Sequence, residues 1–245
     1  MTQKYALITG ASSDLGGAIA LALAQKGYHI ALAGRSQPKL ATLADSIEKR
    51  GGTSIIFVSD LSTIDGINKL IEQVKNDTTH VDVLINAAAI WHGDNEVFAN
   101  RDFETFPQKV VLDTLMVGLT APTLISHALI PIMPPKSKII NISGTFEDGG
   151  KGWIPYYVSK RAIEDLTIGL ADELKEEDIQ VNCISPSDTA TEVYKKYFPQ
   201  FASDANSPDE IATLAVNLCL PESDKVTGKV FIIKHGSPVT EKFHF

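Results

Sequence analysis

Short apolar runs alternate with longer amphipathic segments along most of the chain. Seven runs of four or five residues are apolar enough for strands buried on both faces of a sheet, and they lie at 5–8, 29–33, 54–58, 81–85, 138–142, 180–184 and 230–233. Six segments repeat apolar residues at helical spacing, at 15–26, 37–50, 63–78, 108–131, 154–176 and 208–220. Gly27 and the pair Gly51-Gly52 lie where the first two of these helices are expected to stop.

The alternation of strands and helices predicts a doubly wound α/β fold, with a seven-stranded parallel sheet, helices on both faces and right-handed crossovers. No Pro/Gly/Ser-rich linker divides the chain, so residues 1–245 are expected to form a single domain. In sheets of this kind ligands bind at the carboxyl ends of the strands, near the switch in strand order. The candidate site residues are therefore those that follow each strand.

Composition narrows the class of protein further. Hydrophobic residues at 44% and charged residues at 21% are ordinary for a globular domain. The net charge of −8 disfavours binding to nucleic acid or anionic lipid, and no run of about 18 apolar residues indicates a membrane helix. The first apolar run lacks the layout of a signal peptide, and the isolated Cys183 and Cys219 argue against a disulfide framework or a zinc site. We expect a cytoplasmic protein without a bound metal.

A glycine-bearing turn, Thr9 to Gly17, follows the first strand. Its small residues allow backbone N–H groups and the start of the next helix to approach a pyrophosphate, although a tight turn with close helix packing has the same composition. A carboxylate at Asp14 would repel a phosphate about 5 Å away by on the order of 3 kcal/mol at an effective dielectric constant of about 20. We therefore interpret Asp14 as a cap of the helix, with its carboxylate pointing away from the phosphates.

The ends of the second and third strands bear on which nucleotide would bind there. Arg35 follows the second strand, and no acid stands beside it, so a guanidinium is available for a 2′-phosphate and no carboxylate is available for ribose hydroxyls. This contrast favours NADP(H) over NAD(H), although an ordinary solvated arginine fits the same position. After the third strand, Asp60-Leu61 is placed to meet the adenine, or Asp60 caps the following helix.

The remaining strand ends add small and hydroxylated residues. Asn86-Ala87-Ala88-Ala89 after the fourth strand offers a floor of small side chains for a flat ligand. Ser143-Gly144-Thr145 after the fifth strand places a hydroxyl at the edge of the sheet. After the sixth strand the segment from Ser185 to Thr191 breaks regular structure, and Thr191 is within reach of a carboxamide or phosphate.

Tyr156 and Lys160 lie four residues apart in the fifth predicted helix, on one face and about one turn from each other. A phenol with an ordinary pKa of about 10 exchanges its proton poorly at neutral pH, but a nearby ammonium stabilises the phenolate and lowers that pKa. The pair can therefore act as a general acid or base on an alcohol or carbonyl. The alternative is a ring packed on the core and a charge in water.

Taken in order, these segments resemble the short-chain dehydrogenase/reductases, a family with a Rossmann fold, over nearly the whole chain. The matching segments are Thr9-Gly10 to Gly16 for the cofactor turn, Asn86 to Ala89 for the Asn-Asn-Ala-Gly strand end, Tyr156 to Lys160 for Tyr-x-x-x-Lys, Pro186-Ser187 for the Pro-Gly turn, and Val226 to Val230 for the lead into the last strand. The resemblance implies an NADP(H)-dependent oxidoreductase that acts on a small-molecule carbonyl or alcohol. Tyr156 would pass the proton, Lys160 would lower its pKa and hold the nicotinamide ribose, and a serine would hydrogen-bond the substrate oxygen.

The resemblance also assigns residues to the site. The catalytic residues that it implies are Ser143, Tyr156 and Lys160. The residues expected to bind the cofactor are Gly10, Ser12, Ser13, Asp14, Leu15, Gly16, Arg35, Asp60, Leu61, Asn86, Ala87, Ala88, Tyr156, Lys160, Pro186, Ser187, Thr189 and Thr191.

Departures from the family pattern fall close to the chemistry. Gly118 stands where the family usually has an Asn that helps to hold a proton-relaying water. By the family's usual interval of thirteen residues before the tyrosine the catalytic serine is Ser143, but by strand register its place falls on Gly144, with Thr145 as the alternative hydroxyl. The departures keep a second hypothesis open, a catalytically weakened dinucleotide-binding protein with a sensing or scaffolding role.

Aromatic residues near the predicted site suit an apolar or planar substrate, or else they pack in the core or at a subunit contact. They are Trp91, Phe146, Trp153, Tyr194, Tyr197 and Phe198. By resemblance, residues 190–208 are expected to cover the substrate. Also by resemblance, the helices at 108–131 and 154–176 are expected to pack against a second subunit in a homodimer or homotetramer.

Overall fold

Parallel strands form the centre of the molecule in a single sheet with the order β3-β2-β1-β4-β5-β6-β7-β8. This computed structural model describes residues 3–147 and 149–244. The strands are β1 (Tyr5–Thr9), β2 (His29–Gly34), β3 (Thr53–Val58), β4 (Val83–Asn86), β5 (Lys138–Ile142), β6 (Gln180–Pro186), β7 (Lys229–Ile233) and β8 (Thr240–Glu241). The predicted α/β fold and its seven parallel strands are confirmed. The predicted strand number is one too small, because β8 adds an antiparallel edge strand to β7.

The helices match the six predicted segments, with one addition. They are α1 (Asp14–Ala24), α2 (Gln37–Glu48), α3 (Ile64–Asp77), α4 (Gln108–Leu115), α5 (Ala121–Leu129), α6 (Ile154–Glu173), α7 (Glu192–Tyr197) and α8 (Pro208–Cys219). The segment predicted as one helix at 108–131 is divided by a π-helical turn, Met116–Thr120, which separates α4 from α5. The addition is α7, which lies inside the segment expected to cover the substrate.

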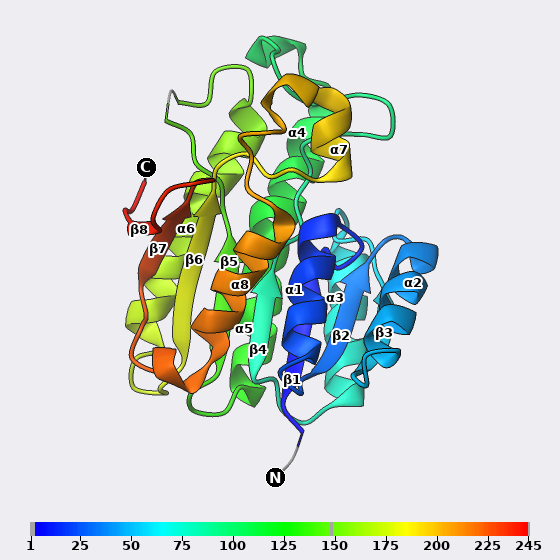
Figure 1. Ribbon diagram of the computed structural model, residues 1–245, viewed down its shortest axis with the longest axis vertical. Helices are drawn as coiled ribbons and strands as arrows, with labels where there is room; N and C mark the ends of the chain where they lie inside the picture. Colours follow the sequence, from blue (N-terminus) through cyan, green and yellow to red (C-terminus); the bar gives the residue numbers. More distant parts are fainter. Residues whose placement is uncertain (1–2, 148, 245) are drawn as a thin grey trace.

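Helices cover both faces of the sheet (Figure 1). Successive residues of β1 face opposite sides, so that Ile8 packs in the core under α1, α2 and α8, and Leu7 packs in the core under α3 and α5. The strand order reverses between β1 and β4, because α1 leads from β1 to one side of the sheet and α3 leads back to the other. A ligand site is therefore expected above the carboxyl ends of β1 and β4, at the end of the sheet where Figure 1 shows α7.

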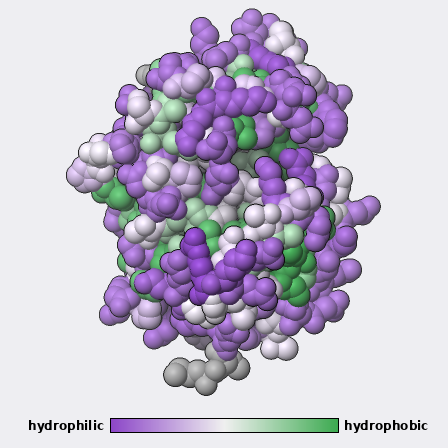
Figure 2. All heavy atoms as spheres, turned by 45° about the vertical axis from the view of Figure 1, so that its right-hand side comes forward, coloured by the Kyte–Doolittle hydropathy of each residue, from purple (hydrophilic) through white to green (hydrophobic). Residues whose placement is uncertain are grey.

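One described helical run, Gln108–Ile132, is long and apolar enough to cross a membrane by length and composition alone. Within the domain 39% of its apolar window is buried, α4 packs against α6 and α5 packs against α3. The face of the molecule in Figure 2 is mostly hydrophilic, with hydrophobic residues in small separated patches. The run therefore serves the packing of the domain.

Candidate active site

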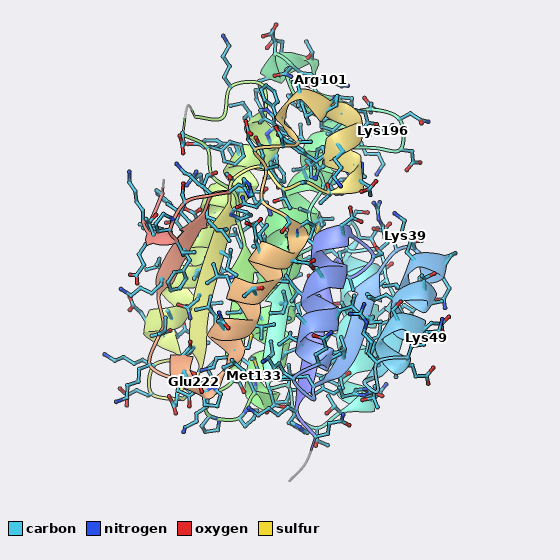
Figure 3. All side chains as sticks on the ribbon, in the orientation of Figure 1. Lys39, Lys49, Arg101, Met133, Lys196 and Glu222 are labelled. Atoms are coloured by element: carbon cyan, nitrogen blue, oxygen red, sulfur yellow. The ribbon has the colours of Figure 1, made fainter. Side chains whose placement is uncertain are left out.

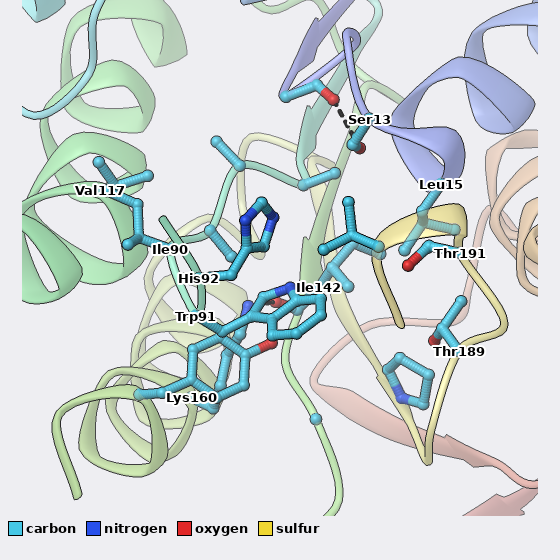
Figure 4. Close-up of a pocket in the computed structure, with 18 of the residues that line it drawn as sticks. Ser13, Leu15, Ile90, Trp91, His92, Val117, Ile142, Lys160, Thr189 and Thr191 are labelled. Carbon is cyan, nitrogen blue, oxygen red and sulfur yellow. Dashed lines mark hydrogen bonds between the residues drawn. The ribbon is translucent and has the colours of Figure 1, made fainter. Parts of the chain in front are cut away.

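A cavity of about 740 Å³ opens at the carboxyl ends of the parallel strands (Figure 4). Its lining comes from the segments that follow six strands and from α2, α6 and α7. The predicted site residues that line it are Gly10, Ser12, Ser13, Asp14, Leu15, Arg35, Asp60, Leu61, Ala87, Ala88, Ser143, Tyr156, Lys160, Pro186, Ser187, Thr189 and Thr191. Two predicted cofactor-binding residues, Gly16 and Asn86, do not line the cavity and lie behind the residues that do.

The turn after β1 is built so that the backbone approaches closely. Gly10 has φ +70°, and a Cβ there would lie 2.8 Å from Ala88 Cα, so only glycine fits. A Cβ at Gly16 would lie 2.3 Å from the Gly10 carbonyl oxygen, which explains why Gly16 packs the helix against the turn and does not line the cavity. Ser13 caps α1, since its Oγ accepts a hydrogen bond from Gly16 N at 3.1 Å and donates one to Gly10 O at 2.8 Å (Figure 4).

The interpretation of Asp14 as the cap of this helix is therefore wrong, because Ser13 has that role. Asp14 is the first residue of α1, and its Oδ2 accepts a hydrogen bond from Glu192 N at 2.6 Å. Glu192 begins α7, whose cap is Thr191. The carboxylate thus joins the cofactor turn to the helix that lies over the cavity, a contact between residues too far apart in sequence for a local pattern to reveal.

Two cations lie at the end of the cavity next to β2. Arg35 is exposed and makes no hydrogen bond or ion pair with the described part of the chain. Lys39, which the sequence interpretation missed, comes from the first turn of α2 and lines the same cavity. Figure 3 shows Lys39 at the end of α2 nearest α7. The two side chains together give this end of the cavity positive charge.

Asp60 lies on the opposite side of the same end. Its Oδ1 accepts hydrogen bonds from Ser62 N at 3.0 Å and from Ser62 Oγ at 2.8 Å. Partial burial would raise the pKa of Asp60, but these bonds and the charges of Arg35 and Lys109 outweigh it and lower the pKa. The cap of α3 is Thr63, whose Oγ1 accepts from Gly66 N at 3.0 Å, so Asp60 shapes the loop and does not cap the helix.

The floor of small residues after β4 is fixed from beneath. Thr9 Oγ1 accepts hydrogen bonds from Ala87 N at 3.2 Å and from Ala88 N at 3.4 Å. Asn86 Nδ2 donates to Asn141 Oδ1 at 2.9 Å, which ties β4 to β5 below the cavity. Asn86 Oδ1 is buried and has no hydrogen-bond partner among the described residues.

Tyr156 and Lys160 lie on α6 and both face the cavity. Lys160 Nζ lies 5.2 Å from the centre of the Tyr156 ring and donates to the Ile142 carbonyl at 2.8 Å. Burial lowers the pKa of Lys160 to about 8, although the charges of Cys183 and Glu164 oppose that shift. Burial also raises the pKa of Tyr156 above its usual value. In the protein alone Tyr156 is therefore a protonated phenol, and Lys160 titrates near the physiological range.

Ser143, the predicted catalytic serine, has a partner that the sequence did not indicate. Its Oγ donates to Glu164 Oε1 at 2.8 Å, with the serine 2% exposed and the glutamate 0% exposed. Glu164 Oε2 accepts from Arg161 Nη1 at 2.9 Å and from His244 N at 3.1 Å. The serine is thus held by a buried carboxylate one helical turn below Lys160.

Gly118 lies in the π-helical turn and faces α6. A Cβ at this position would lie 2.8 Å from Ser159 Oγ, so Ser159 fills the space that a side chain would take. Ser159 Oγ in turn donates to the Tyr156 carbonyl at 2.7 Å. An amide at position 118 is absent, and Ser159 leaves no room for one without movement of α6.

Aromatic rings form the wall of the cavity beyond Tyr156. The centre of the Trp91 ring lies 6.5 Å from the ring centres of both Trp153 and Tyr194. The ring centre of Phe198 lies 5.2 Å from that of Tyr194. Figure 4 shows Trp91 between Lys160 and His92. His92 Nδ1 lies 2.8 Å from the Gly93 carbonyl, and no acid of the described chain pairs with it. Since Tyr194 comes from α7, the covering segment contributes to this wall.

The residues present fit a dinucleotide. The Gly10 turn forms a cradle that a Cβ would fill, the start of α1 lies beside it, and the end of β2 carries two cations suited to a phosphate. The floor of Ala87 and Ala88 lies directly against the Gly10 turn, and Tyr156 and Lys160 line the same cavity. A ligand that spans it would have its phosphates at the turn and its far ring beside Tyr156.

Comparison with known proteins gives consistent matches. A family profile described as short chain dehydrogenase matches residues 4–201. A fatty acyl-CoA reductase from Acinetobacter baylyi is 33% identical over 87% of this chain and 72% of its own length. Among solved structures, a blue fluorescent protein from a metagenomic library in complex with NADPH has a TM-score of 0.85 at 25% identity, covering 95% of this chain and 97% of its own. Landomycin C-6 ketoreductase LanV with bound NADP and rabelomycin has a TM-score of 0.82 at 25% identity, covering 94% of each chain.

Proposed function

Because the chain belongs to the short-chain dehydrogenase family of oxidoreductases, we propose that it transfers a hydride between NADP(H) and a carbonyl or alcohol, with Tyr156 exchanging the proton. The observation that carries this proposal is that Tyr156 and Lys160 face the same cavity as the Gly10 turn. The cofactor, when bound, supplies or accepts the hydride. The chain's own residues then have to orient the substrate and provide a proton.

In the reducing direction Tyr156 gives its phenolic proton to the carbonyl oxygen as charge develops there. Lys160 lies close enough to stabilise the phenolate that remains, and its hydrogen bond to the Ile142 carbonyl fixes the ammonium in place. Because burial raises the pKa of Tyr156, the proton stays on the phenol until a positive charge or a developing negative charge draws it off.

The preference for NADP(H) over NAD(H) is part of the proposal. Arg35 and Lys39 supply positive charge where β2 ends, and the residue after the strand is not an acid. LanV and the metagenomic protein carry NADP or NADPH in their structures, which supports the same choice. Arg35→Ala is expected to weaken NADPH binding by about 10- to 100-fold and to leave NADH binding unchanged. Equal affinity of the wild type for the two cofactors, measured by fluorescence titration, would contradict the assignment.

For the substrate we propose a flat, uncharged carbonyl compound. Trp91, Trp153 and Tyr194 form the wall opposite the cofactor floor, and aromatic walls suit ring systems. LanV, a ketoreductase whose structure holds rabelomycin, is a relative that supports this class. The test is NADPH oxidation with a panel of aromatic ketones and quinones, sugar ketones and ketoacyl thioesters, with Tyr156→Phe as control. Wild-type rates no higher than those of the control with every compound would refute the reductase.

A second function, dinucleotide binding for sensing or scaffolding, is favoured by Gly118 and by the engagement of Ser143 with Glu164. It predicts NADPH binding without turnover, and a partner affinity that changes when NADPH is added. A cytoplasmic homodimer or homotetramer remains our expectation for either function, to be measured by sedimentation.

A further inference from the structure

The hydroxyl of Ser143 is committed to a carboxylate. A serine has one hydroxyl hydrogen, and that of Ser143 goes to Glu164 Oε1 at 2.8 Å, between two buried side chains. An ionised carboxylate can only accept, so it cannot hand the hydrogen back to the cavity. A carbonyl oxygen of a substrate also can only accept. Toward the cavity Ser143 Oγ can therefore only accept a hydrogen bond, whereas the carbonyl oxygen of a substrate needs a donor.

The pairing of β5 with α6 shows which residue comes next. Asn141 Nδ2 donates to Thr167 Oγ1 at 2.9 Å, and two residues further along the chain Ser143 donates to Glu164, one turn earlier in the helix. Two residues of a strand span about 6.6 Å and one turn of a helix spans about 5.4 Å, so each second residue of the strand meets about the next turn of α6. One more step brings Thr145 level with the turn of α6 at Lys160.

Backbone contacts support this placement of Thr145. Ser143 N donates to Ile184 O at 2.8 Å and Thr145 N donates to Pro186 O at 2.9 Å, so the extended pairing with β6 continues to Thr145 and both side chains point to the same side. The next residue, Phe146, packs its ring 6.0 Å from that of Tyr156. Thr145 lines the cavity and is half-buried.

The Thr145 hydroxyl is free to turn toward a ligand at small cost. Its Oγ1 lies 3.3 Å from Pro186 O, beyond the range of about 2.5–3.0 Å that is usual for a hydroxyl donor, so this hydrogen bond is weak. The same carbonyl already accepts from Thr145 N. The carbonyl therefore keeps a partner when the hydroxyl leaves.

We propose that Thr145 is the catalytic hydroxyl that donates to the substrate oxygen, and that Ser143 is a positioning residue held by Glu164. The proposal rests on the reductase function proposed above. As the carbonyl carbon takes a hydride and NADPH becomes NADP⁺, the oxygen takes the Tyr156 proton and an alcohol forms. Thr145 keeps its proton throughout and stabilises the oxygen while its negative charge grows.

The test measures NADPH oxidation with 9,10-phenanthrenequinone, a planar diketone. Thr145→Val is expected to lower kcat by about 100-fold, as for the loss of one donor to a developing oxyanion, while Thr145→Ser stays within a few-fold of the wild type. Thr123→Val is the matched control, because its hydroxyl donates to the Leu119 carbonyl inside the helical layer. Ser143→Ala is expected to lower the melting temperature, since Glu164 loses a donor, and to lower kcat less than Thr145→Val does.

Gly144 offers a second and independent variant. The nearest atoms to a Cβ at Gly144 are Phe146 Cε2 at 3.7 Å, Pro186 O at 3.9 Å and Lys160 Cγ at 4.0 Å, so a serine fits without strain. It would place a new hydroxyl beside Lys160. Gly144→Ser added to Thr145→Val is expected to recover at least tenfold of the lost kcat.

The outcomes separate the two proposals. Turnover by the wild type with Thr145→Val equal to Thr123→Val would overturn the role of Thr145 and leave the reductase standing. A larger loss of kcat in Ser143→Ala than in Thr145→Val, with normal NADPH binding, would return the role to Ser143. Absence of turnover with every compound of the carbonyl panel, by wild-type protein that binds NADPH, would overturn the reductase, and the assignment of Thr145 with it.

Discussion

Replacement of Glu164 by glutamine tests the buried network that underlies the site. Glu164 is fully buried on α6 and accepts hydrogen bonds from Ser143 Oγ, Arg161 Nη1 and His244 N at 2.8, 2.9 and 3.1 Å. These donors come from the end of β5, from α6 itself and from the C-terminal segment. One carboxylate therefore ties together three separate parts of the chain.

Glutamine keeps the shape of this side chain and removes one acceptor and the charge. With its amide oxygen toward Arg161 and His244, its amide nitrogen meets Ser143 Oγ, which must then accept in place of donating. The bond to Arg161 also loses its charged acceptor, and a hydrogen bond to a charged group contributes about 1.5–3 kcal/mol. Breaking a buried ion pair by removing one partner costs about 3–5 kcal/mol. Since the Arg161 side chain is 13% exposed and keeps some contact with water, we take the lower end, about 3 kcal/mol.

The expected change is large enough to measure directly. For a chain of 245 residues, an unfolding entropy of about 2.1 cal/mol/K per residue converts 1 kcal/mol into roughly 2 °C, so Glu164→Gln should lower the Tm by about 6 °C in scanning calorimetry. The control is Glu173→Gln, the same chemical change at an exposed position of α6. If the two variants melt within about 2 °C of each other, the carboxylate does not hold the network and the reasoning fails.

Other predictions concern the cofactor and the proton. Tyr156 keeps its proton because burial raises its pKa, whereas Lys160 loses its proton as the pH rises through its pKa of about 8. We therefore expect kcat/KM for carbonyl reduction to fall above that pH, and a flat profile from about pH 6 to 10 would contradict this. Lys39→Ala should raise the Kd for NADPH roughly fivefold and leave that for NADH unchanged in fluorescence titrations. Gly10→Ala should raise the Kd for both cofactors at least tenfold, since its methyl would lie 2.8 Å from Ala88 Cα at φ +70°; binding within about twofold of the wild type would refute the cradle.

The parts of the fold that could be predicted are those with a strong hydrophobic pattern. The seven parallel strands, most of them buried on both faces, have continuous apolar runs, and that signal predicts all seven. β8 could not be predicted in the same way, because Thr240 and Glu241 are exposed and are held to β7 by backbone pairing and by the ion pair of Glu241 with Lys229 at 2.9 Å. The six-residue helix α7 was missed for a related reason, since it is too short to show a clear helical period.

Contacts between distant residues set a second limit. The sequence pattern predicts Asp14 as the helix cap, and only the fold shows that Ser13 has this role and that the Asp14 carboxylate meets the start of α7. Lys39 has the same limit, because nothing in the local sequence shows that it lines one cavity with Arg35. Charge and residue type can be read along the chain, but the partner that gives a charge its role has to be found in space.

The proposed catalytic hydroxyl shows what counting along the chain leaves open. An interval of thirteen residues before Tyr156 selects Ser143, yet an interval counts chain length and does not fix orientation. Ser143 and Thr145 face the same side of the extended segment, so what separates them is the turn of α6 that each one meets. The proposal of Thr145 draws on the pairing of β5 with β6 and α6, which turns Ser143 to Glu164 and continues the extended backbone as far as Thr145. The register of one strand thus determines which oxygen–hydrogen bond is available beside Tyr156.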